Sequence, residues 1–193
     1  TRATRTSEID PKAPYYVIAN TSASAVQAVN KAISQGKSVY LTDDGYIVDR
    51  DTFASLLPNY AIYGEALYKV PNGPTLKPLK IYSPNYHYDW TGVDAPAHTS
   101  LVLEKLGFQI VDTPDEADVI VLENNRFDAS IFGKKPTLVI GGEAMQKLEK
   151  LGVLSGFDAE KLKGGSDYEG LMKAIIDDQN PLTSGYKKNA LFY

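Results

Sequence analysis

Cysteine is absent from the 193 residues of this chain, and histidine occurs only as His87 and His98. The lack of cysteine excludes disulfide bonds, thiolate nucleophiles and cysteine-ligated zinc. Neither histidine belongs to an HExxH pattern, and nothing in the sequence brings the two together with a third ligand. We therefore predict no metal site in this chain.

Basic charge is also scarce, with 20 Lys and Arg residues against 24 Asp and Glu residues and a net charge of −4. Because phosphate binding needs a basic face, this balance predicts no nucleic-acid partner. No apolar run approaches the roughly 18 residues of a membrane span, so none is predicted. The hydrophobic share of 43% and the charged share of 23% are instead typical of a folded globular domain.

The two ends of the sequence suggest a piece of a longer polypeptide. The chain opens at Thr1 with neither a start methionine nor a signal peptide. It closes on an apolar run at residues 190–193, which favours a strand and a truncated C-terminus. A processed mature protein is the alternative.

The first part of the chain predicts a polar arm followed by a small α/β subdomain. Residues 1–14 are polar, contain two prolines and indicate a linker or loose arm, and residues 15–74 form the subdomain. The turn Asp43-Asp44-Gly45 predicts a hairpin. The other expected elements are strands at 15–19, 39–41, 61–63 and 67–70, a helix capped by Ser22 or Ser24 and ended by Gly36, and a short helix over 52–57.

Prolines and glycines at 71–74 and Pro78 mark a boundary, after which residues 78–193 alternate strands with helices. The pattern predicts an open, mostly parallel α/β sheet with helices on both faces, of the flavodoxin or class I amidotransferase kind. The expected strands are 79–82, 108–111, 119–122 and 137–140. Three helices are expected. The first is capped by Asp94 and ended by Gly107, and the second begins after Gly141-Gly142. The third carries Leu171, Met172, Ile175 and Ile176.

Ligands of open α/β sheets bind beyond the carboxyl ends of the strands, so the loops at these ends are the candidate sites. The loop after the strand at 79–82 is aromatic, and such a loop suits a sugar, a peptide or a protein partner. The alternative is a loop that folds its own aromatic side chains over the end of the sheet. Its candidate ligand-binding residues are Tyr86, His87, Asp89 and Trp90.

Two further loops contribute candidates. Glu123 follows the strand at 119–122 and could bind a ligand amine, with an ion pair to Arg126 or plain solvation as the alternatives. Gly142 lies where a nucleophile elbow would carry Ser or Cys, so we predict no catalytic residue there. The glycines could present a helix N-terminus to an anion, or form a purely structural turn.

From Tyr63 onward, the order of several segments resembles one known family, the non-catalytic amidotransferase-like domain that follows the catalytic domain in exported bacterial zinc carboxypeptidases of the carboxypeptidase A type. The segments are Gly64-Glu65-Ala66-Leu67-Tyr68, Pro71-Asn72-Gly73-Pro74, Lys80-Ile81-Tyr82, Asp89-Trp90, Leu103-Glu104-Lys105-Leu106-Gly107-Phe108, Ala117-Asp118-Val119-Ile120-Val121-Leu122 and Asn180-Pro181-Leu182-Thr183-Ser184-Gly185-Tyr186.

The resemblance implies an accessory domain with an extracellular or cell-surface location. Its partner would be the catalytic domain of the same polypeptide, which would hold the zinc and the catalytic glutamate, so no cofactor is expected in this chain. The domain would bind or present a peptide or a cell-wall glycan fragment. Because the elbow cysteine is missing, amide hydrolysis by the glutaminase route is excluded. The alternatives are a structural or oligomerising module and an enzyme that uses acids at the end of the sheet.

Overall fold

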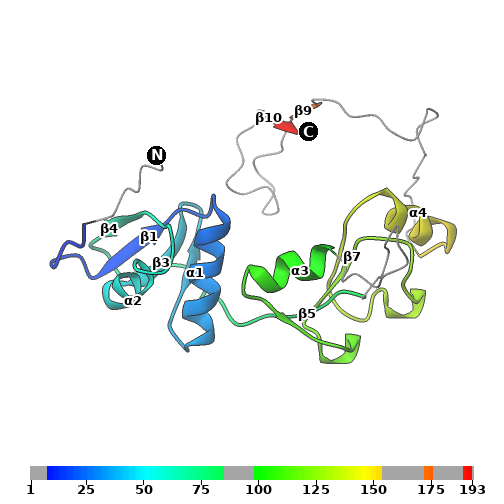
Figure 1. The fold of residues 1–193 in the computed structure, drawn as a ribbon, viewed down its shortest axis with the longest axis horizontal. Helices are drawn as coiled ribbons and strands as arrows, with labels where there is room; N and C mark the ends of the chain where they lie inside the picture. The colour runs from blue at the N-terminus through cyan, green and yellow to red at the C-terminus, as the bar shows by residue number, and fades with distance from the viewer. Residues whose placement is uncertain (1–7, 85–97, 154–171, 176–188, 193) are drawn as a thin grey trace. The chain divides into compact units, whose positions relative to one another are not determined.

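The structure is a computed structural model, and it describes residues 8–84, 98–153, 172–175 and 189–192. The chain divides into two compact units (Figure 1). Unit 1 comprises Thr1–Lys77 with Gly165–Tyr193, and unit 2 comprises Pro78–Gly164.

Unit 1 contains a four-stranded sheet in the order β2-β3-β1-β4, in which each neighbouring pair is antiparallel. In this order, each of the two helices joins strands that are not neighbours. One helix joins β1 to β2, and the other joins β3 to β4. This is the ferredoxin-like βαββαβ arrangement. Its elements are β1 (Tyr15–Ile18), α1 (Ala23–Ser34), β2 (Tyr40–Thr42), β3 (Gly45–Asp49), α2 (Arg50–Leu56) and β4 (Gly64–Leu67).

Local sequence accounts for much of unit 1. Of the two candidate caps of α1, Ser22 takes the role, and its Oγ accepts a hydrogen bond from the Ala25 N–H at 3.1 Å. The predicted hairpin is confirmed by the antiparallel pairing of β2 with β3. Between the sheet and the helices, the rings of Tyr16 and Phe53 stack with centroids 4.3 Å apart.

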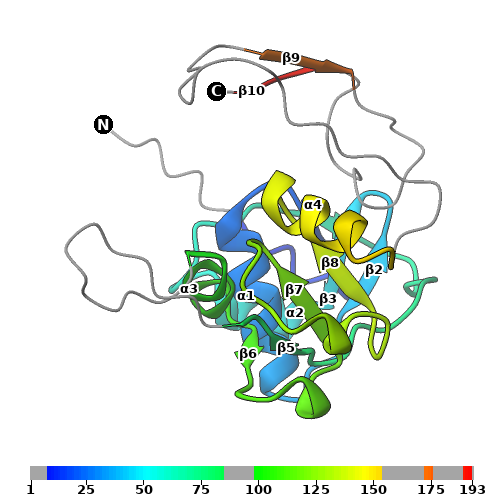
Figure 2. The same cartoon turned by 90° about the vertical axis from the view of Figure 1, so that its right-hand side faces the viewer.

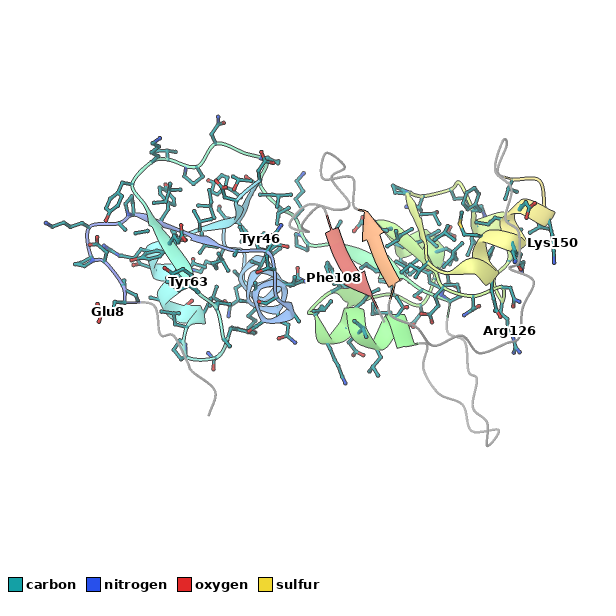
Figure 3. The ribbon with its side chains drawn as sticks, turned by 90° about the horizontal axis from the view of Figure 1, so that it is seen from above. Glu8, Tyr46, Tyr63, Phe108, Arg126 and Lys150 are labelled. Carbon is teal, nitrogen blue, oxygen red and sulfur yellow. The ribbon has the colours of Figure 1, made fainter. Side chains whose placement is uncertain are left out.

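The prediction of two strands at 61–63 and 67–70 is wrong, because a single strand, β4, forms between them. Gly64 begins this strand where Phe53 lies so close that an added Cβ would be 2.5 Å from the ring. On either side, Ile62 is buried while Tyr63, labelled in Figure 3, and Val70 are exposed, so the apolar residues do not follow one strand face.

Unit 2 contains a four-stranded sheet in the order β6-β5-β7-β8, and each neighbouring pair is parallel (Figure 2). The mixed α/β class predicted from the sequence is confirmed. The elements are β5 (Lys80–Tyr82), α3 (His98–Lys105), β6 (Gln109–Ile110), β7 (Val119–Leu122), β8 (Thr137–Val139) and α4 (Gly142–Lys150), with 3-10 helices η1 (Pro114–Glu116) and η2 (Ala129–Ile131).

Strand β7 is buried on both faces, as its unbroken apolar sequence predicts. Successive strand residues point to opposite faces, yet Ile120, Val121 and Leu122 are all buried. Ile120 and Leu122 pack with Ala144 and Leu148 of α4, so α4 covers their face of the sheet.

Helix α3 ends before Gly107, whose φ of 88° lies in the left-handed region that favours glycine. The N-cap predicted for this helix, Asp94, lies outside the described residues. Leu101 and Val102 on α3 are 36% and 54% exposed.

Near the C-terminus, the helix predicted around Met172 and Ile175 is wrong. Met172–Ile175 is a strand, β9, which pairs antiparallel with β10 (Asn189–Phe192). A short apolar run has too few residues for its periodicity to separate a helix from a strand, so the distant pairing partner decides. The strand predicted from the apolar C-terminal run is confirmed by β10.

Candidate functional site

The strand order of unit 2 defines a switch point between β5 and β7. From β5 the chain passes first to β6 on one side and later to β7 on the other side. In open α/β sheets, the connections diverge at such a point and leave a crevice beyond the carboxyl ends of the two strands. Ser83 follows the end of β5, and Glu123 follows the end of β7. These residues therefore lie at the position where this architecture binds ligands.

The strand register places both side chains on the same face of the sheet. Ile81 of β5 pairs with Val119 of β7 in a parallel register. Because paired residues share a face and every second residue returns to it, Ser83 and Glu123 share the face of Ile81 and Val119. Ile120 and Leu122, which pack with α4, occupy the opposite face.

Glu123 contacts the beginning of α3. The Thr99 N–H donates a hydrogen bond to Glu123 Oε2 at 3.0 Å. This contact places a carboxylate at the positive N-terminal end of the helix, where the helix dipole stabilises negative charge. Sequence reasoning considered Arg126 and solvent as partners and missed Thr99, because 24 residues separate it from Glu123.

Ser83 is the unusual polar group of this site. Its side chain is 2% exposed. Its Oγ atom has no hydrogen-bond partner within the described part of the chain. Leaving a hydroxyl buried and unsatisfied costs about 1–3 kcal/mol, and native proteins contain few such groups. Sequence reasoning missed this residue. Its position just beyond a predicted apolar strand was the signal that could have found it.

The turn between β8 and α4 lies beside the end of β7. A Cβ added at Gly141 would be 3.6 Å from the backbone oxygen of Glu123. Gly141 has a φ of 85°, which L side chains rarely adopt, and gives α4 no side-chain cap. Gly142 and Glu143 are exposed. The structure thus brings Glu123 close to this turn, where the elbow position carries glycine rather than a nucleophile.

Lys147 of α4 holds the loop that follows Glu123. Its Nζ donates hydrogen bonds to the backbone oxygens of Asn125, at 2.8 Å, and Phe127. The same ammonium lies 4.6 Å from the centroid of the Phe127 ring, within the range of a cation–π contact. Arg126 in this loop and Lys150 at the end of α4 mark this region in Figure 3.

Hydrogen bonds, more than charge, perturb the Asp128 carboxyl group beside this loop. The pKa of Asp128 is lowered, first by the backbone hydrogen bond from Ser130, then by the Ser130 side chain, and less strongly by the positive charges of Lys134 and Lys147. Among the residues that the structure describes at the site itself, Glu123 supplies the carboxylate. Ser83 supplies the buried hydroxyl on the same face of the sheet.

Four residues predicted for the site, Tyr86, His87, Asp89 and Trp90, lie outside the described residues. The residues that flank this stretch are Pro84, which follows β5, and His98, which begins α3.

Among the described residues, no group of three His, Asp or Glu side chains is placed to hold a metal ion. Within the same ranges, no helix has the length and apolar character needed to cross a membrane.

Unit 1 contains a pocket of about 440 Å³ beside α1 and α2. Lys31, Gln35 and Asn59 line it and are all exposed. It contains none of the residues predicted from the sequence and no buried polar atom lacking a partner among those described. The switch point of unit 2 is therefore the stronger candidate.

No family model matches this chain, and neither a curated protein nor a solved structure matches it.

Proposed function

We propose that this chain is a non-catalytic accessory domain of a zinc carboxypeptidase-like exported protein, and that it binds a small ligand at the carboxyl end of its parallel sheet. The strand order supports this proposal. Numbered within unit 2, β6-β5-β7-β8 becomes 2-1-3-4, which is the order of the flavodoxin-like sheet without its fifth strand. Proteins of the flavodoxin-like fold bind ligands at the switch point, and Ser83 and Glu123 flank the corresponding position of this sheet.

The buried hydroxyl of Ser83 is the observation that carries the proposal. A domain that served only as a scaffold would gain stability from Ala at this position, because the unsatisfied hydroxyl opposes folding. A ligand that hydrogen-bonds to Ser83 compensates for this penalty. Functional sites are where such locally unfavourable groups are retained.

The turn at Gly141 supports the non-catalytic part of the proposal. An elbow nucleophile is the group that would attack an amide, and this turn carries glycines in a chain that lacks cysteine. Peptidase chemistry would belong to the catalytic domain of the parent protein, which would also hold the zinc. The role proposed for this chain is to bind or present a peptide or cell-wall fragment to that domain outside the cell.

A thermal-shift screen of the full chain tests the proposal. Peptides, cell-wall fragments and sugars are added at millimolar concentration to the wild type, to Ser83→Ala and to Ser34→Ala. Ser34 is the matched control, since it is exposed and its Oγ donates to the Lys31 carbonyl. We expect a ligand that raises the unfolding temperature of the wild type and of Ser34→Ala but not of Ser83→Ala. An equal rise in all three proteins would show that the ligand binds elsewhere.

A second candidate function is a purely structural or oligomerising module that packs on the catalytic domain. It is favoured by Leu138 and Ile140, which are 44% and 43% exposed at the edge strand β8 and the residue that follows it. Exposed apolar side chains at a sheet edge commonly mark an interaction surface. If the chain self-associates through this edge, sedimentation equilibrium would give a mass that rises with concentration, and Leu138→Thr would restore the monomer mass.

A further inference from the structure

We infer that Ser83 and Glu123 together recognise an uncharged hydroxyl group, and that the ligand is therefore a saccharide or another polyol. This inference rests on the proposed function, since it assigns the ligand class of the same site.

The register makes Ser83 and Glu123 diagonal neighbours. Continuing the pairing of Ile81 with Val119 places Ser83 level with Val121, and Glu123 one same-face position further along the adjacent strand. Adjacent strands lie about 4.8 Å apart, and same-face residues follow each other at about 6.6 Å along a strand. Side chains in this relation are close enough for one small group to contact both.

The two side chains require complementary partners. A carboxylate only accepts hydrogen bonds, and the Thr99 N–H already donates to Oε2 of Glu123. Its other oxygen also carries lone pairs that can accept a donor. The Ser83 hydroxyl can both donate and accept. A ligand hydroxyl donates its proton to Glu123 and accepts the proton of Ser83 with a single oxygen atom. Because Ser83 is only 2% exposed, its contact with a ligand is limited to a small group such as a single hydroxyl.

The charges around the site select against ionised groups. The Glu123 carboxylate repels a phosphate or carboxylate ligand. The N-terminal end of α3, which contacts Glu123 through Thr99, offsets part of the attraction of Glu123 for a cation. An ammonium group could donate to both side chains, but it has no lone pair and would leave the Ser83 proton without an acceptor. A neutral hydroxyl satisfies both side chains without adding a charge.

NMR titration of the full ¹⁵N-labelled chain tests this inference. The probes are maltotriose, cellotriose and glycerol for hydroxyl groups, with acetamide and inorganic phosphate as the competing classes. We expect a trisaccharide to shift the amide signals of Ser83 and Thr99 in a saturable way. Glu123→Gln should weaken binding about tenfold or more, as expected for losing a hydrogen bond to a charged group, and Ser83→Ala should weaken it by up to about tenfold, as expected for a neutral hydrogen bond. Glu104→Gln, an exposed change on α3, should leave the affinity unchanged.

The outcomes separate the inference from the proposal on which it rests. If acetamide or phosphate shifts the two signals in a Ser83-dependent way and the hydroxyl probes do not, the saccharide inference is overturned while the binding site stands. If no probe shifts either signal, the saccharide inference is overturned, and the thermal-shift screen with peptides and cell-wall fragments decides the proposed function separately. Saccharide shifts that persist unchanged in Ser83→Ala and Glu123→Gln would place the sugar at a different site and also overturn the inference.

Discussion

Replacing Ser83 by alanine is expected to stabilise the unliganded protein. Most substitutions of buried residues destabilise a protein, so the predicted sign is unusual. The change keeps the Cβ atom and removes an Oγ that is buried and has no partner among the described residues. No hydrogen bond within that part of the chain is lost, and the desolvation penalty of the hydroxyl disappears.

The magnitude follows from the cost of an unsatisfied hydroxyl. That cost is about 1–3 kcal/mol. Removing one oxygen from a packed site also leaves a small void, and the lost packing offsets part of the gain in stability. We therefore expect the free energy of unfolding of unit 2 to rise by about 1 kcal/mol or slightly more. For a unit of this size, such a gain corresponds to a rise of roughly 4–8 °C in the unfolding temperature.

Hydrogen exchange is the assay that assigns the gain to the correct unit. The amides of residues 120–122 lie in the buried strand β7, so their slowest exchange reports the opening of unit 2. Their protection should increase in Ser83→Ala, and the urea midpoint of the same protein should rise. Ser34→Ala should change stability by less than about 0.5 kcal/mol. If Ser83→Ala lowers the protection, the hydroxyl has a partner in the folded state and the reasoning fails.

Three further predictions test other parts of the structure. Gly64→Ala should destabilise unit 1 by about 1–3 kcal/mol in urea unfolding, because its Cβ would lie 2.5 Å from the Phe53 ring. Lys147→Met should speed amide exchange in the loop after β7, since it removes the ammonium that binds two backbone oxygens there. The pKa of Asp10 is lowered, first by the Tyr68 hydroxyl. Tyr68→Phe should raise that pKa in an NMR titration. The stabilisation that Asp10 provides should be present above its unfolded-state pKa and lost as the pH falls through the lower folded-state pKa.

The elements that the sequence predicted correctly are those whose stabilising contacts are local or whose burial is complete. Ser22 caps α1 through an amide three residues away, and β7 is apolar throughout because both of its faces are covered. The elements that were missed depend on distant partners. Met172–Ile175 is a strand because it pairs with Asn189–Phe192, and no local periodicity reveals that pairing.

The candidate site shows the same division. The loop after β7 and the glycine turn after β8 were identified from the sequence because polar and glycine residues directly follow apolar strands. The contact between Thr99 and Glu123 depends on how α3 packs on the sheet. The isolation of the Ser83 hydroxyl depends on the surroundings of a single atom, which composition and spacing do not specify.

The central claim is that Ser83 is kept for binding rather than for folding. The most direct test is to measure the unfolding temperature of the wild type and of Ser83→Ala, each with and without the best stabilising sugar or peptide. We predict that Ser83→Ala unfolds at a higher temperature without ligand and gains little from the ligand that stabilises the wild type. A variant that is less stable than the wild type and responds equally to the ligand would contradict the claim.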